Sequence, residues 1–121
     1  MESAFKYDET AKGLCSKTDY PYLATDGHEC GIASCQKVNG TAVTDYIDIP
    51  EKDKHGLIAA IVQGPVSIAM EADQLQFQFY KSGVFDDSSC GAGGQVDHGV
   101  LAVGYGTDAA TNKTFFTVKN R

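Results

Sequence analysis

Hydrophobic residues recur at helical spacing in two segments of the chain. In residues 1–12 the apolar Ala4, Phe5 and Ala11 lie among charged neighbours, and Gly13 follows as a C-terminal cap. Residues 51–63 place four apolar side chains on one helical face, and acidic residues in the first turn favour the helix dipole. We therefore predict one helix in each segment.

Apolar residues alternate with polar ones, or run together, in four segments that we predict to be β-strands. These strands cover residues 43–49, 66–70, 96–105 and 114–119. Pro50 ends the first strand, and the polar residues 106–113 join the last two as a long hairpin turn. Residues 73–80 suit a short helix or a turn. This order of elements predicts an α+β fold in which an antiparallel sheet carries one packed helix.

The hydrophobic periodicity disappears between residues 14 and 40, where three of the four cysteines lie. Turn-forming residues together with Cys15, Cys30 and Cys35 predict an irregular, cross-linked region. The composition shifts near residue 40. We therefore expect two parts, a cysteine-rich part over residues 1–40 and a β unit over residues 41–121.

Length and charge exclude several classes of protein. The chain has 121 residues, enough for one ordinary core, and 16 acidic against 10 basic residues give a net charge of −6. An acidic chain without a basic cluster repels phosphate backbones, so we expect no nucleic-acid partner. Its apolar stretches are far shorter than the roughly 20 residues that cross a bilayer, and its first residues lack a signal-peptide pattern. We expect neither a membrane partner nor a signal peptide.

His98 lies near the start of the most apolar predicted strand, residues 96–105. A lone histidine is more often structural than catalytic, but the hairpin gives this one a specific neighbour. If the turn is centred near residue 109, antiparallel pairing places Asn120 directly opposite His98, with both side chains on one face. The Asn120 carbonyl then accepts a hydrogen bond from one ring nitrogen and leaves the other nitrogen free to take a proton from a nucleophile. A register slip of one residue would separate this pair.

Cys90 is a nominal nucleophile because it lies in a glycine-rich loop upstream of His98, and Ser88 and Ser89 are weaker candidates. A structural disulfide suits Cys90 better, because no predicted helix N-terminus follows to stabilise its thiolate. We therefore do not expect any of these three residues to be the nucleophile.

A zinc site is the second interpretation of the cysteines. Its ligands would be Cys15, His28, Cys30 and Cys35. The usual Cys-x-x-Cys spacing is absent, so we expect disulfides there, and neither a metal ion nor another cofactor. Residues 39–41 and 112–114 are Asn-x-Thr patterns for N-glycosylation, and with the cysteines they favour an origin in the oxidising secretory pathway.

Motifs along the whole chain resemble those of papain-like cysteine proteases of the cathepsin L type. Residues 97–106, Asp-His-Gly-Val-Leu-Ala-Val-Gly-Tyr-Gly, are similar to the catalytic-histidine motif, and residues 118–120, Val-Lys-Asn, to the start of the catalytic-asparagine motif. Further matching segments are residues 1–7, 19–22, 64–69 and 79–85. The similarity runs almost from end to end.

The resemblance implies a partial papain-like fold and a role for each residue of the predicted pair. Residues 1–40 would be a remnant of the helical domain, and residues 41–121 most of the antiparallel β-barrel domain. His98 would be the general base and imidazolium partner of a cysteine thiolate, and Asn120 would orient its ring.

The resemblance also implies substrate contacts and disulfide partners. The implied substrate contacts are Ala69, Val96, Asp97 and Gly99, of which Ala69, Val96 and Gly99 line the pocket for the side chain next but one to the cut bond. Cys30 and Cys90 resemble cysteines whose partners lie before and after the segment that this sequence covers. Cys15 and Cys35 are then the pair expected within the chain.

The nucleophile motif, Cys-Gly-Ser or Cys-Gly-Ala followed by Cys and an aromatic residue, does not occur in these 121 residues. We therefore expect the isolated chain to be inactive, with a polypeptide substrate or a complementing chain that supplies the nucleophile as its partner. The alternative is a non-catalytic binding or structural protein derived from such a protease. Parent enzymes of this kind are lysosomal, vacuolar or secreted.

Overall fold

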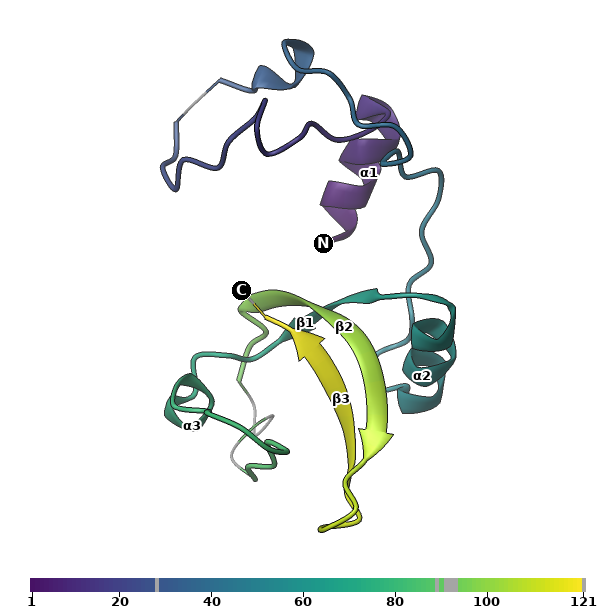
Figure 1. The fold of residues 1–121 in the computed structure, drawn as a ribbon, viewed down its shortest axis with the longest axis vertical. Helices are drawn as coiled ribbons and strands as arrows, with labels where there is room; N and C mark the ends of the chain where they lie inside the picture. Colours follow the sequence, from purple (N-terminus) through teal and green to yellow (C-terminus); the bar gives the residue numbers. More distant parts are fainter. Residues whose placement is uncertain (28, 89, 91–93, 121) are drawn as a thin grey trace. The chain divides into compact units, whose positions relative to one another are not determined.

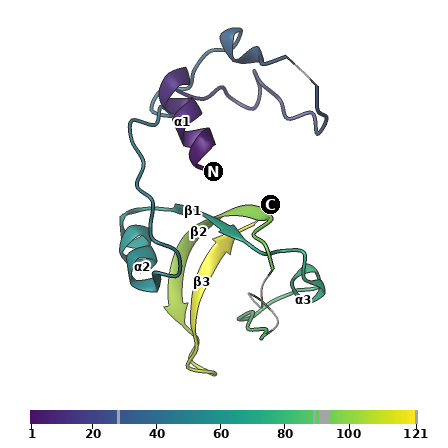
Figure 2. The ribbon, with the colours of Figure 1, turned by 180° about the vertical axis from the view of Figure 1, so that it is seen from behind.

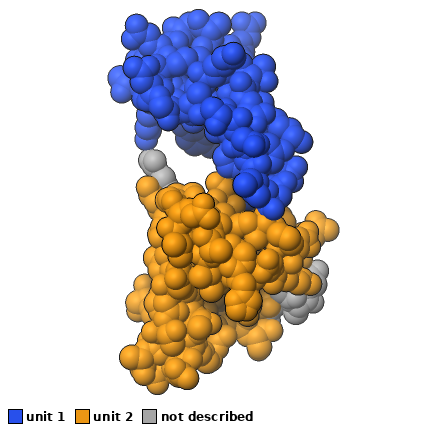
Figure 3. All heavy atoms as spheres, turned by 90° about the vertical axis from the view of Figure 1, so that its right-hand side faces the viewer, with its two compact units in different colours: residues 1–48 blue, residues 49–121 orange. Residues whose placement is uncertain are grey.

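The computed structural model describes residues 1–27, 29–88, 90 and 94–120. The chain divides into two compact units, residues 1–48 and residues 49–121, which Figure 3 colours blue and orange. Helices and an antiparallel sheet are both present, so the predicted α+β class is confirmed. Among the described residues, no helix combines the length and the apolar character that crossing a bilayer requires.

The first predicted helix is confirmed as α1, which spans Glu2–Ala11. It ends at Lys12, whose left-handed backbone (φ 55°) turns the chain into Gly13. Asp8 is only 3% exposed, and its two carboxylate oxygens accept hydrogen bonds from the backbone N–H groups of Gly13 (3.1 Å) and Val43 (3.0 Å). These bonds satisfy the buried carboxylate and join the end of α1 to residue 43.

The predicted strand over residues 43–49 is wrong, because these residues have no strand partner in the structure. The backbone N–H of Val43 donates to the Asp8 carboxylate instead, and that of Tyr46 donates to the side chain of Asp45 (2.8 Å). Backbone donors that are satisfied by side chains in this way do not form a β-ladder.

Aromatic packing holds the same segment against α1. The rings of Phe5 and Tyr46 stack with their centroids 5.8 Å apart. Because of these contacts, unit 1 extends to Asp48, beyond the composition shift near residue 40.

A disulfide cross-links the irregular part of unit 1. It joins Cys15 to Cys35 with a Cα–Cα distance of 5.9 Å, which is the pairing implied by the resemblance. A single antiparallel bridge between Cys15 and Lys37 lies beside it, and a short 3-10 helix, η1, spans Gly31–Ala33. The prediction of an irregular, cross-linked region is confirmed.

The second predicted helix is confirmed as α2, which spans Lys54–Gln63 and contacts the sheet of unit 2 (Figures 1 and 2). It begins at Lys54, later than predicted, because Asp53 is its N-cap and accepts a hydrogen bond from the backbone N–H of Gly56 (2.9 Å). Ile61 of α2 and Ala102 of the sheet are buried in the core, with exposures of 8% and 0%.

The sheet of unit 2 has three antiparallel strands in the order β1-β2-β3, with β2 in the middle (Figure 1). The strands are β1 (Val66–Met70), β2 (His98–Thr107) and β3 (Thr114–Lys119). The pairing of β1 with β2 places Met70 opposite His98. A short helix, α3 (Leu75–Gln78), follows β1 and lies within the segment predicted to be a short helix or a turn.

The register predicted for the β2–β3 hairpin is wrong. The structure pairs Thr107 with Thr114 and Leu101 with Lys119, and a β-bulge between Ala102 and Gly104 shifts the register on the way. The turn therefore lies later in the chain than the predicted centre at residue 109.

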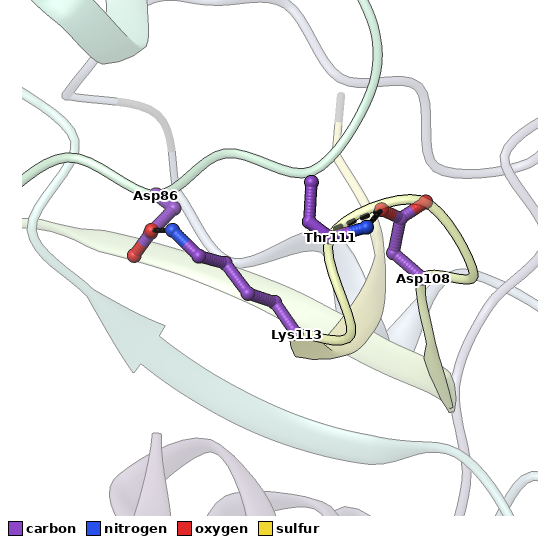
Figure 4. Close-up of polar contacts among 4 residues, drawn as sticks. All are labelled: Asp86, Asp108, Thr111 and Lys113. Carbon is purple, nitrogen blue, oxygen red and sulfur yellow. Dashed lines mark hydrogen bonds and ion pairs between the residues drawn. The ribbon is translucent and has the colours of Figure 1, made fainter.

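Hydrogen bonds made by Asp108 explain the position of this turn (Figure 4). The Asp108 carboxylate accepts from the backbone N–H (2.8 Å) and the hydroxyl (2.5 Å) of Thr111, while its own N–H donates to the carbonyl of Lys113 (2.9 Å). The ammonium of Lys113 pairs in turn with the carboxylate of Asp86. The loop thus covers residues 108–113, and β2 continues to Thr107.

Candidate functional site

The side chains of His98 and Asn120 meet at one end of the sheet of unit 2. His98 is the first residue of β2, and Asn120 directly follows β3. The Nε2 atom of His98 and the Oδ1 atom of Asn120 are 2.7 Å apart, which is hydrogen-bond distance. His98 is half-buried and Asn120 is exposed. The predicted contact is therefore present although the predicted register is wrong.

This hydrogen bond determines the proton arrangement of the neutral imidazole ring. The Oδ1 atom of an asparagine only accepts, so Nε2 of His98 carries the proton and donates it. Nδ1 is then the unprotonated nitrogen, and in the described part of the chain no group is hydrogen-bonded to it. Such a nitrogen is able to take a proton from a nucleophile.

Asp97 fixes the backbone immediately before the histidine. Its N–H donates to the carbonyl of Met70 (3.1 Å), and its carboxylate accepts from the N–H of Ala72 (2.8 Å). Both bonds tie the start of β2 to the chain leaving β1. The position of His98 is therefore set by two strands and not by a loose loop.

A pocket of about 510 Å³ opens beside the pair. Its lining residues are Ala72, Asp73, Phe77, Gln78, Tyr80, Asp97, His98 and Asn120. Phe77 and Tyr80 are held by edge-on packing against Phe85, at centroid distances of 5.5 and 6.0 Å. Asp97, His98 and Asn120 were predicted from the sequence. The other lining residues were not, because nothing in the pattern of residues 72–80 shows that this segment folds back toward β2.

The predicted substrate contacts lie in different surroundings. Asp97 lines the pocket beside His98, whereas Ala69 and Gly99 are paired across β1 and β2 outside it. Val96 is 66% exposed, just before β2. The roles of these four residues in substrate binding stay predictions.

The two free cysteines differ in their surroundings. Partial burial and the nearby carboxylates of Asp87 and Glu71 raise the pKa of the Cys90 thiol. Cys90 is therefore mainly a protonated, weakly nucleophilic thiol at neutral pH. Ser88 makes no hydrogen bond with His98, and Ser89 lies outside the described residues, as do residues 91–93 of the glycine-rich loop.

In unit 1, the Sγ atom of Cys30 lies 3.4 Å from the hydroxyl oxygen of Tyr7. A hydrogen bond from Tyr7, together with one from the backbone of Ile32, lowers the pKa of the Cys30 thiol. The same contact raises the pKa of Tyr7, which is consistent with a Tyr7 hydroxyl that donates to the sulfur.

The zinc interpretation loses two of its ligands, because Cys15 and Cys35 are joined to each other. His28, a third ligand, lies outside the described residues. Within the described part of the chain, no three His, Cys, Asp or Glu side chains gather as a metal site would require. The expectation that the protein uses no metal or cofactor stays a prediction.

Comparison with known proteins shows that the whole chain is similar to cysteine proteases. The sequence profile described as "Papain family cysteine protease" matches residues 1–121. The chain is 44% identical over 121 residues to Cysteine protease 1 of Oryza sativa subsp. japonica, which covers 99% of this chain and 24% of that protein. It is 41% identical over 122 residues to Procathepsin L of Felis catus, covering 99% of this chain and 36% of that protein.

A further relative is a KDEL-tailed cysteine endopeptidase of Arabidopsis thaliana, 39% identical over 122 residues that cover 99% of this chain and 31% of that protein. The chain thus spans between about a quarter and about a third of the length of these three curated relatives.

Proposed function

The chain belongs to the papain family of cysteine proteases, and on this premise we propose that residues 1–121 supply the histidine and the asparagine of a cysteine endopeptidase site. His98 acts as the general base and imidazolium partner of a thiolate, and Asn120 holds its ring. The observation that carries the proposal is the 2.7 Å hydrogen bond that leaves Nδ1 of His98 unprotonated in the neutral ring.

The proposed reaction is acyl transfer followed by hydrolysis. A cysteine thiol gives its proton to Nδ1 of His98, and the thiolate attacks the carbonyl carbon of the scissile peptide bond. The imidazolium then protonates the leaving amine, and water hydrolyses the thioester. Throughout these steps Nε2 stays bound to Asn120, so the ring nitrogen that exchanges the proton keeps its orientation.

The nucleophile in this proposal comes from outside the 121 residues. The Cys-Gly-Ser-Cys type of motif is absent from them, and the raised pKa of Cys90 makes it a poor substitute. Residues 41–121 would then correspond to most of the β-barrel domain of the parent enzyme, and residues 1–40 to a remnant of its helical domain.

We propose that the substrates are polypeptides and that the protein passes through the oxidising secretory pathway. Ala69, Val96 and Gly99 would contact the substrate side chain next but one to the cut bond. The Cys15–Cys35 disulfide fits a lysosomal, vacuolar or secreted protein. One relative carries a KDEL tail, a signal that is read in the endoplasmic reticulum, which agrees with this route.

A chimera tests the catalytic proposal. Residues 1–121 replace the matching segment of Procathepsin L of Felis catus, and the activated chimera is assayed on a fluorogenic dipeptide substrate. We expect hydrolysis, a loss of about 10²- to 10⁴-fold in kcat/KM for His98→Ala, and a loss of about 10²-fold for Asn120→Ala, which misplaces the ring. Lys119→Ala, an exposed neighbour of Asn120, is the matched control and retains activity.

Two outcomes would contradict the proposal. The first is a folded, active chimera whose rate is unchanged by His98→Ala. The second is cleavage by the isolated 121-residue chain that Cys90→Ser abolishes, which would assign the nucleophile to this chain.

The open sheet favours a second candidate function, association with another chain. β3 is an outer strand of the three-stranded sheet, and apolar side chains on and beside β2 are exposed, among them Val96 (66%), Val103 (41%) and Tyr105 (47%). Exposed strand edges and apolar patches promote binding to other chains. A co-purified partner with a Cys-Gly-Ser-Cys-Trp segment would favour a split enzyme. A partner without that segment would favour a non-catalytic binding role. A stable monomer would contradict association with another chain.

A further inference from the structure

Asn112 lies in the exposed loop that joins β2 to β3. Its backbone has a left-handed conformation (φ 55°), which asparagine adopts more readily than most residues. The backbone N–H of Asn112 donates to the carbonyl of Asp108 (2.8 Å), so its backbone is fixed within the turn while the residue is exposed to solvent.

The neighbours of Asn112 are held by contacts of their own (Figure 4). The Asp108 carboxylate accepts two hydrogen bonds from Thr111, and the Lys113 ammonium pairs with Asp86, in the segment after α3. The side chain of Lys113, which follows Asn112, is therefore held in an ion pair. Asn112 thus lies in a loop whose backbone conformation is fixed by hydrogen bonds.

Asn112, Lys113 and Thr114 form an Asn-x-Thr sequence, the acceptor pattern for N-glycosylation. Thr114 is the first residue of β3 and is exposed, and in the described part of the chain its hydroxyl makes no hydrogen bond. Both side chains that the glycosylating enzyme must read are thus accessible on the folded hairpin.

The other Asn-x-Thr sequence, residues 39–41, is different in the folded chain. The hydroxyl of Thr41 accepts a hydrogen bond from the N–H of Leu14 (2.8 Å) and donates one to the carbonyl of Val38 (2.7 Å). This threonine is part of the structure of unit 1, whereas Thr114 is not engaged in this way. The hairpin sequence is therefore the one that stays available after folding.

We propose that Asn112 is an N-glycosylation site of this protein. The Nδ2 atom of Asn112 forms a bond to the anomeric carbon of an oligosaccharide carried on a lipid diphosphate. The bond between that carbon and the diphosphate oxygen breaks, the lipid diphosphate leaves, and the amide nitrogen loses one proton. The proposal rests on the secretory route given above and is independent of the chemistry at His98.

The position of Asn112 separates this modification from the candidate site. The loop joins the end of β2 that is remote from His98, and a strand of ten residues measures roughly 30 Å along its length. A glycan at Asn112 therefore adds a large solvated group without occupying the pocket lined by His98 and Asn120.

Translation with endoplasmic-reticulum microsomes tests the proposal. The full 121-residue chain follows a cleavable signal peptide, and every variant also carries Asn39→Gln so that any glycan reports on the hairpin sequence. We expect one glycan that peptide-N-glycosidase removes, with conversion of Asn112 to aspartate in the peptide mass. Asn112→Gln and Thr114→Val lose this glycan, whereas Thr114→Ser retains it because serine keeps the hydroxyl.

Thr114→Val keeps the Asn112 backbone and a β-branched side chain in β3, so loss of the glycan in this variant does not reflect a misfolded loop. Signal-peptide cleavage and protection from added protease show that the chain has entered the microsome. A protected, cleaved chain with unmodified Asn112 would overturn the proposal. Modification that persists in Thr114→Val would also overturn it, because the threonine would then play no part.

Discussion

The Nε2 atom of His98 and the Oδ1 atom of Asn120 are 2.7 Å apart although the two residues are not direct partners across the hairpin. The ladder pairs Leu101 with Lys119, so its continuation places Asn120 opposite Val100. Val100 lies two residues from His98 on the same face of β2. His98 and Asn120 are thus diagonal neighbours, a distance that their side chains span.

The tautomer of His98 should depend on this diagonal contact. In the neutral ring we expect the proton on Nε2, and we expect Asn120→Leu, which removes the acceptor but keeps the bulk, to let both tautomers form. Nitrogen NMR shifts of the imidazole ring measure this directly. Gln78→Leu, in the same pocket but bonded to the carbonyl of Asp73, is the control and should leave the tautomer unchanged. An Asn120→Leu spectrum identical to that of the native chain would show that Asn120 does not fix the ring.

The predicted contact between His98 and Asn120 is present despite the wrong register because the error near these residues is two positions. Side chains alternate across a strand with a period of two, so such an error keeps both residues on one face. The β-bulge between Ala102 and Gly104 and the hydrogen bonds of Asp108 decide the true register. Neither has a clear signal in the pattern of apolar residues.

The periodicity of apolar residues correctly predicted α1, α2 and the three strands of unit 2. It failed at residues 43–49, where alternation looks like a strand but the Asp8 carboxylate takes the backbone donor of Val43. It also did not reveal the pocket beside His98, because Phe77 and Tyr80 reach it only through packing on Phe85. Long-range side-chain contacts of this kind leave no local pattern.

The two free thiols should react at different rates. The pKa of Cys30 is lowered by the hydrogen bond from Tyr7, and that of Cys90 is raised by partial burial and nearby carboxylates. We therefore expect iodoacetamide at neutral pH to alkylate Cys30 before Cys90, because the thiolate is the reactive form. Tyr7→Phe should raise the pKa of Cys30 and slow its alkylation, as followed by peptide mass spectrometry.

Tyr22→Phe is the control for that experiment, since Tyr22 is 86% exposed and lies in the same unit. It should leave both alkylation rates unchanged. Equal rates for the two cysteines, or an unchanged rate at Cys30 in Tyr7→Phe, would argue against the thiol–hydroxyl contact.

The buried carboxylate of Asp8 should contribute strongly to the stability of unit 1. Asp8→Ala leaves the N–H groups of Gly13 and Val43 without their acceptor, and we expect a loss of about 2 kcal/mol in the free energy of unfolding. Urea unfolding followed by circular dichroism measures it. Glu2→Ala, on the exposed part of α1, should cost about 0.5 kcal/mol or less. Equal losses in the two variants would contradict the role assigned to Asp8.

Asp108 should make the β2–β3 loop sensitive to acid. The hydroxyl and N–H of Thr111 donate to its carboxylate and lower its pKa. A lowered pKa in the folded chain means that the stabilising hydrogen bonds are fully present above the ordinary aspartate pKa of about 4 and are lost as the pH falls through the folded value. The backbone N–H of Asn112 donates a hydrogen bond within this loop, so we expect its hydrogen exchange at acidic pH to be faster, relative to the intrinsic rate, than at neutral pH.

Thr111→Val removes the hydroxyl and should raise the pKa of Asp108, as read from the carboxyl carbon shift in an NMR titration. Thr117→Val, in β3 and opposite Gly104, is the control and should leave that pKa unchanged. If Thr111→Val also leaves it unchanged, the hydroxyl contact does not determine the ionisation of Asp108.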